Sequence, residues 1–141
     1  MKTFRFARLK RIREIEKRIA EERFAEALQQ LNSLVGKARR YTNLYKEYKY
    51  LFENGDLDWL ELYNLIKLIK NIQSDLNNAY KNLQTRREEL LEANVSVKMM
   101  EKLEDMWKEE VFAEELRVLQ EVLDDFASYT TFTVKSQKES R

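Results

Sequence analysis

Glycine and proline are almost missing from this chain, and the shortage limits what it can fold into. The 141 residues contain two glycines, Gly36 and Gly55, and no proline. Because these residue types supply most tight turns, a compact domain with many reversals of chain direction is disfavoured. Charged residues make up 36% of the chain and apolar residues 43%, the mixture of a long amphipathic helix. We therefore expect an all-α protein with very few turns.

The clearest turn signal lies in the stretch LFENGDLDW, residues 51–59. Asn54 and Gly55 tolerate a left-handed backbone conformation just beyond a helix C-terminus. Asp56 or Asp58 supplies an N-cap for a helix that follows. The stretch therefore predicts the tip of a helical hairpin.

Apolar side chains recur at alternating steps of three and four residues on both sides of this tip, the spacing of a coiled-coil seam. The seam positions before the tip are Phe24, Ala27, Leu31, Leu34, Ala38, Tyr41, Tyr45, Tyr48 and Phe52. Those after it are Leu62, Leu65, Ile69, Ile72, Leu76, Ala79, Leu83, Arg86, Leu90, Ala93, Val97 and Met100. The pattern predicts a single domain, a long antiparallel two-helix coiled-coil hairpin, with helix 1 over about residues 3–53, a tip over 54–56 and a longer helix 2 over about 57–129. Residues 130–141 lose the helical pattern and are expected to be a flexible tail.

Two features of the helix 1 seam have alternative interpretations. Tyr41, Tyr45 and Tyr48 form a ladder that could bind a partner, but their seam spacing favours core packing. Gly36 lies inside the helix, where it costs about 1 kcal/mol relative to alanine, and we expect it to mark a close approach of the two helices.

The net charge of +1 hides a strong separation of charge along the chain. Residues 1–20 hold eight Lys/Arg and two Glu, whereas residues 101–125 hold ten Asp/Glu and three Lys/Arg. A chain that folds back on itself sets these segments side by side, which favours a monomeric hairpin over a parallel dimer. A basic arm also suits nucleic acid or a membrane surface, but the acidic segment competes for its charges. We expect neither partner.

The residue types that perform most catalysis are missing. Cysteine and histidine are absent, so thiolate and imidazole metal sites and the usual nucleophile and base pairs are excluded. Two separated glycines cannot form a phosphate-binding loop. No apolar run of 18 residues and no signal peptide occurs. We expect a soluble cytoplasmic protein that is not an enzyme and has no cofactor, metal or small-molecule ligand.

Helix 2 is predicted to continue past the end of helix 1. Pairing outward from the tip sets Phe4 near Asp105, so the segment from Trp107 to Tyr129 has no partner within the chain. Five of its apolar residues form one stripe, and other apolar residues flank it; the stripe is made of Phe112, Leu116, Leu119, Leu123 and Phe126. A single helix with so much apolar surface needs something to bury it.

A second group of apolar residues lies off the seam near the tip. Trp59, Tyr63 and Ile66 fall on a face about 100° from the helix 2 seam, and Leu44 and Leu51 lie at the shoulder of the helix 1 seam. A two-helix hairpin cannot cover this face and the seam together. Either a partner docks here, or self-association or a local kink buries these side chains.

Both ends of the chain resemble a known family. The stretch FRFARLKRIREIEKRIAEERFAEAL, residues 4–28, and the stretches MEKLEDMWKEE and LDDFA, residues 100–110 and 123–127, are similar to the terminal blocks of the flagellar export protein FliJ and its injectisome stalk relatives. The resemblance implies an antiparallel coiled coil like the part of a rotary ATPase stalk that enters the catalytic hexamer. It covers essentially the whole chain.

The resemblance also implies partners and a location. The paired termini would enter a hexameric export ATPase through Phe4, Phe6, Arg8, Arg11 and the stripe of helix 2. The tip-proximal residues would meet the export gate at the cytoplasmic face of the membrane, and export chaperones are a further partner; these residues are Leu44, Leu51, Trp59, Tyr63 and Ile66. The acidic C-terminal block departs from the Lys- and Gln-rich block common in the family, so charge contacts with the ATPase do not carry over. The alternatives are a chaperone-like escort for export substrates or other chaperones, and a generic dimeric scaffold.

Overall fold

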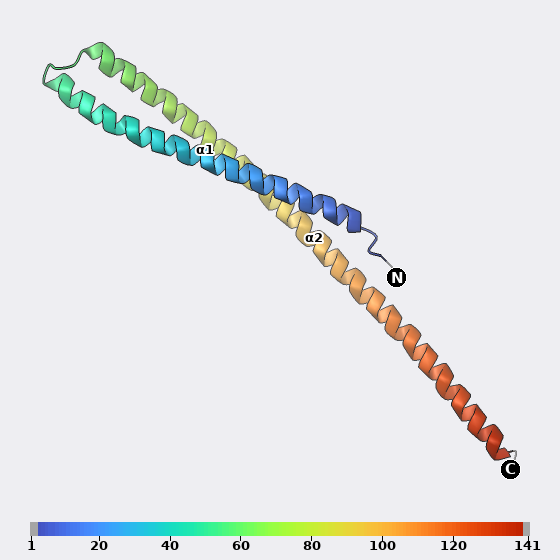
Figure 1. Cartoon of the computed structure of the whole chain (residues 1–141). Helices are drawn as coiled ribbons and strands as arrows, with labels where there is room; N and C mark the ends of the chain where they lie inside the picture. The colour runs from blue at the N-terminus through green and yellow to red at the C-terminus, as the bar shows by residue number, and fades with distance from the viewer. Residues whose placement is uncertain (1–2, 140–141) are drawn as a thin grey trace. The chain divides into compact units, whose positions relative to one another are not determined.

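The chain forms two helices, α1 (Ala7–Glu53) and α2 (Trp59–Glu139), which pack against each other (Figure 1). This computed structural model describes the backbone of residues 3–139 and the side chains of residues 3–129. No strand occurs in that range, which confirms the all-α helical hairpin. The chain divides into two compact units. We call residues 12–97 the hairpin unit, and residues 3–11 with 98–139 the terminal unit.

The tip of the hairpin unit ends α1 in a Schellman motif. Gly55 has a φ of +77°, the left-handed conformation expected there. The Asp56 amide donates to the Leu51 carbonyl at 2.8 Å, and the Gly55 amide donates to the Phe52 carbonyl at 3.0 Å. These two bonds satisfy carbonyls that the end of a helix otherwise leaves without partners.

The first turns of the two helices differ in their acidic residues. Asp58 precedes α2, and its carbonyl accepts the first helical bond from the Leu62 amide at 3.4 Å, so Asp58 occupies the N-cap position. Glu61 adds a negative charge to the first turn, where the helix dipole favours it. The first turn of α1 has no acidic residue, and α1 begins at Ala7 rather than near residue 3.

The predicted seam is the core of the hairpin unit. Of the described side chains, six are buried, and all six lie in this unit: Ala20, Ala27, Leu62, Leu65, Ile72 and Val97. The other predicted seam residues are half-buried apart from Phe52, which is exposed beside the turn. Half-burial of Tyr41, Tyr45 and Tyr48 places the tyrosine ladder in the seam, as core packing requires.

Polar side chains continue the seam where apolar ones stop. Before Phe24 the same spacing runs through Ala20, Lys17 and Arg13, and the two basic side chains are half-buried. Their aliphatic stems cover apolar surface while the charged ends reach water. Arg86 interrupts the α2 seam in the same way, with its guanidinium donating to the Glu89 carboxylate at 3.0 Å.

Two expectations about the backbone need correction. The α2 backbone stays helical to Glu139 rather than ending near residue 129, because no glycine or proline interrupts it. The side chains of the expected tail, residues 130–141, lie outside the described residues, and its flexibility stays a prediction. Gly36 does not mark a close approach, since a Cβ at this position would meet no atom within 4 Å.

The two glycines should respond to alanine with opposite signs. Gly55→Ala forces a left-handed residue to carry a Cβ, which costs about 1–2 kcal/mol of folding free energy. Gly36→Ala lies in open space inside α1 and should stabilise the protein by up to about 1 kcal/mol. Thermal unfolding followed by circular dichroism measures both. Destabilisation by Gly36→Ala would mean that the two helices meet there after all.

Candidate partner-docking surfaces

The N-terminal residues of the terminal unit pack on the side of α2. The Phe4 ring lies 5.6 Å from the Trp107 ring and 5.9 Å from the Phe6 ring, measured between centroids. Phe6 is 39% exposed, and the Arg5 guanidinium lies 5.6 Å from its ring centroid. Phe4 therefore anchors the N-terminus to Trp107, while Phe6 remains at the surface.

A charged cluster fixes the start of α1 beside α2. The Lys10 ammonium donates to Glu104 at 2.6 Å, and Lys108 lies 3.3 Å from the other oxygen of the same carboxylate. The Glu104 side chain is only 21% exposed. Hydrogen bonds from Lys10 and Lys108 lower the pKa of Glu104, because both favour the charged carboxylate. Arg8 and Arg11, by contrast, are exposed and form no salt bridge with any described residue.

We call residues 108–129 the C-terminal overhang, because α2 continues there past the contact between Phe4 and Trp107. The predicted stripe is exposed along its whole length: Phe112 62%, Leu116 50%, Leu119 53%, Leu123 51% and Phe126 67%. Polar contacts within the overhang join successive turns, with Arg117 to Glu121 at 3.1 Å and Gln120 to Asp124 at 3.0 Å. Such pairs support a single helix but do not remove the apolar stripe from water.

Aromatic rings gather at the tip of the hairpin unit. Trp59, which is 58% exposed, lies 5.7 Å from Phe52 and 6.2 Å from Tyr63 between ring centroids. The Lys67 ammonium lies 4.8 Å from the Tyr63 ring centroid, a cation–π distance. We call Phe52, Trp59 and Tyr63 the tip aromatic patch.

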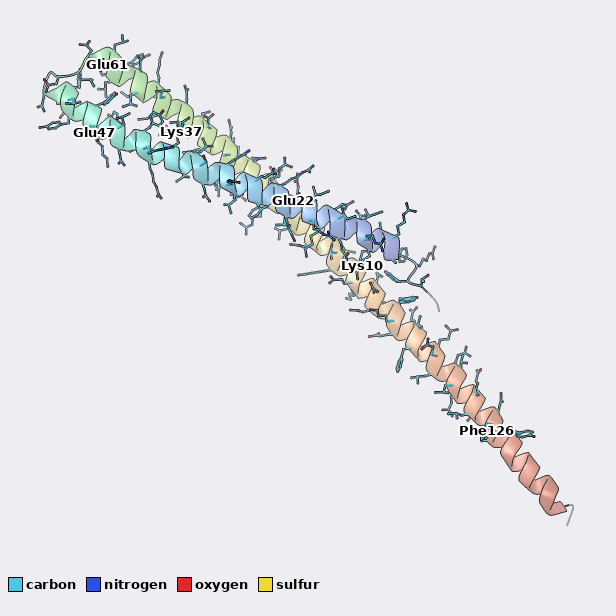
Figure 2. The ribbon with its side chains drawn as sticks, viewed as in Figure 1. Lys10, Glu22, Lys37, Glu47, Glu61 and Phe126 are labelled. Atoms are coloured by element: carbon cyan, nitrogen blue, oxygen red, sulfur yellow. The ribbon has the colours of Figure 1, made fainter. Side chains whose placement is uncertain are left out.

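The structure does not bring all five predicted gate residues together. Trp59 and Tyr63 stack, and Leu51 is exposed in the last turns of α1. Leu44 lines a shallow groove with Lys37, Arg40 and Tyr41, whereas Ile66 lines a different groove with Tyr45, Ile69 and others. Figure 2 marks Lys37 and Glu61 on the two helices of this unit. Leu44 and Ile66 therefore line separate grooves, whereas the rings of Trp59 and Tyr63 are in direct contact.

Sequence reasoning missed some members of these surfaces. Phe52 was assigned to the seam, but as the last seam position before the turn it joins the tip aromatic patch instead. Lys67 lies four residues after Tyr63, a spacing that places two side chains on one face of a helix and that could have signalled this contact. The pairing of Lys10 with Glu104 was signalled only by the general separation of charge along the chain.

The exposed rings and the apolar stripe have the character of surfaces that contact other proteins. Within the described residues, no group of three or more Asp or Glu side chains could hold a metal ion. In the same range no helix has the length and apolar character needed to cross a membrane. Exposed rings and apolar stripes on rigid helices are typical of docking sites for other proteins.

Comparison with known proteins gives one match. The family model described as flagellar FliJ protein matches residues 1–136, nearly the whole chain. Searches of curated proteins and of solved structures return no match.

The charged cluster around Glu104 should make the attachment of the N-terminus depend on pH. Since the folded pKa of Glu104 is lowered, its contribution is present at neutral pH and is lost as the pH falls through that value. Glu104→Gln should therefore lower the temperature at which Phe4 separates from Trp107 at pH 7, and the difference from wild type should shrink as the pH falls below the ordinary pKa range of a glutamate carboxyl. Fluorescence of Trp107 in a Trp59→Phe background measures it.

Glu121→Gln is the matched control, because it removes an exposed pair from the overhang. Exposed pairs contribute little, so this variant should melt like wild type at neutral and at acidic pH. Equal effects of the two substitutions would show that the Glu104 cluster does not hold the N-terminus.

Proposed function

We propose, from the fact that the chain belongs to the flagellar FliJ protein family, that it is a non-enzymatic stalk that couples the export ATPase to the export gate. The terminal unit would dock in the hexameric ATPase, and the tip would meet the gate protein at the cytoplasmic face of the membrane. Export chaperones are a further partner in this proposal.

The apolar stripe of the overhang is the observation that carries the ATPase contact. Its members lie on a single helix and are half or more exposed. Docking in a protein sleeve removes several hundred Å² of apolar surface from water, which contributes on the order of 5–10 kcal/mol before the costs of association. A helix with this surface is suited to insertion between surrounding subunits.

The N-terminal residues would support that contact in two ways. Phe4 packs on Trp107 and so ties the start of the chain to the base of the overhang. Phe6, Arg8 and Arg11 remain exposed and can meet the mouth of the ring. Phe4 therefore has a positioning role, whereas the other three are candidates for direct contact.

The tip aromatic patch supports the gate contact. Trp59 and Tyr63 lie beyond the seam, and the structure covers neither with another helix. Aromatic side chains of this exposure are over-represented at binding hot spots. Leu44, Leu51 and Ile66 would extend the contact along the two helices.

Loss of the overhang stripe should reduce stimulation of the ATPase. Leu116→Ser with Leu123→Ser removes two exposed apolar side chains, so the folded hairpin should persist while affinity for the hexamer falls about 100-fold. ATP turnover by the cognate export ATPase, measured at increasing concentrations of the stalk, gives the result. Circular dichroism checks the fold.

Glu110→Ser with Asp125→Ser is the matched control on the opposite face of the same helix. It should stimulate the ATPase nearly as well as wild type. Equal loss in both variants would point to general weakening of the helix. Unchanged stimulation by the Leu variant, together with micromolar binding of export substrates without the ATPase, would favour the chaperone-like escort.

Loss of the tip aromatic patch should reduce export without unfolding the protein. Trp59→Ala with Tyr63→Ala leaves the seam intact, so the melting temperature should stay close to that of wild type while binding to the gate protein and flagellar export fall. Swimming motility and a pull-down with the gate protein measure these effects. A large fall in melting temperature would instead show that the two rings belong to the core.

A further inference from the structure

Carboxylates outnumber cationic side chains around the tip aromatic patch. Residues 50–66 contain four carboxylates, Glu53, Asp56, Asp58 and Glu61, and no Lys or Arg. All four are exposed, and none forms a salt bridge with a described residue. Lys49 and Lys67 stand at the two ends of this segment, and Lys67 lies over the Tyr63 ring. Residues 49–67 therefore hold four carboxylates against two lysines, and the charge around the exposed rings is negative on balance.

One ring of the tip already binds a cation, and a better ring remains open. Lys67 lies over Tyr63 at 4.8 Å, so the geometry of the patch accepts an ammonium group. No described Lys or Arg lies over Trp59, although it is 58% exposed and indole is the strongest cation–π acceptor among side chains. An arriving guanidinium or ammonium would meet the indole face and the carboxylates together.

We propose that the tip aromatic patch binds a basic, amphipathic segment of a partner protein, with an Arg or Lys side chain on Trp59 and apolar side chains against Phe52 and Leu60. Leu60 is 65% exposed and lies in the same first turn of α2, about 100° round the helix from Trp59, so it widens the exposed apolar surface at the tip. This inference rests on the proposed function, because it places a cationic partner on the tip surface that would contact the gate protein.

The same charges disfavour other occupants. Anionic lipid and nucleic acid carry negative charge and would be repelled by the four carboxylates. A second copy of the tip would bring eight carboxylates together, so association of two tips is opposed as well. The basic N-terminus of another copy has the right charge, and the experiment below separates it from a foreign partner.

The experiment uses the full-length chain with Trp107→Phe, which leaves Trp59 as the only tryptophan. The probe is a short helical peptide with leucines on one face and arginines beside them. The matched peptide replaces each arginine with citrulline, which keeps the shape and removes the charge. The arginine peptide should change Trp59 fluorescence at micromolar concentration, and the citrulline peptide should bind about tenfold more weakly.

Two sets of neutralised variants locate the effect. Glu53→Gln, Asp56→Asn, Asp58→Asn and Glu61→Gln together should weaken the arginine peptide about tenfold and remove most of the salt dependence; Asn at residue 58 still caps α2. Glu109→Gln, Glu110→Gln, Asp124→Asn and Asp125→Asn on the overhang should leave the Trp59 response unchanged. Equal binding of both peptides, or loss of response in the overhang variant, would overturn the proposal.

Two further outcomes separate this inference from the proposed function. If Trp59 does not respond to the peptide while Trp59→Ala with Tyr63→Ala still blocks export, the cationic occupant is wrong and the tip contact stands. If the peptide binds but those substitutions leave export intact, the gate contact fails. Self-association in sedimentation velocity that disappears in the tip-neutralised variant would assign the patch to the N-terminus of a second copy, which also overturns the proposal.

Discussion

Removal of the apolar seam from water is the interaction that holds the hairpin unit together. Leu62, Leu65 and Ile72 are buried although the unit has only two helices, because side chains at steps of three and four interlock across one narrow contact. The rest of each helix circumference stays in water. Every apolar residue outside the seam is therefore a potential binding surface, since this architecture has no second layer to cover it.

The seam and the turn could be predicted because both depend on local sequence. Heptad spacing determines which face of a helix is apolar. Gly55 tolerates the left-handed conformation because of its own structure, independently of residues far away in the sequence. The contact of Phe4 with Trp107 depends instead on the register between two segments that are about a hundred residues apart in the sequence. Counting residues outward from the tip predicts this register only to within one helical turn. The end of α2 was missed because threonine and serine lower helix propensity without stopping a helix.

The candidate surfaces could be predicted only in part, for a related reason. Periodicity gives the angle of a side chain about the axis of its own helix, and that angle groups Phe112, Leu116 and Leu119 in one stripe. Their exposure was predicted by the count outward from the tip, which leaves this part of α2 beyond the end of α1. Periodicity does not say which neighbours from the other helix lie beside a side chain. Leu44 and Ile66 were grouped by their distance from the seam, yet they line different grooves. Phe52 shows the reverse case, a seam residue that becomes surface because the facing helix ends.

Negative charge accompanies apolar surface at both candidate sites, and the combination has a physical consequence. The overhang, residues 108–129, carries seven Asp/Glu and two Lys/Arg, and residues 50–66 carry four Asp/Glu with no Lys or Arg. Exposed apolar faces without charge attract each other and lead to aggregation, whereas like charge opposes contact between identical surfaces of two copies. A basic partner with an apolar face would be attracted both by the apolar surface and by the negative charge. The same carboxylates oppose contact between identical surfaces of two copies and would favour a partner whose binding site is cationic, so charge would select among the apolar contacts that the exposed surfaces allow.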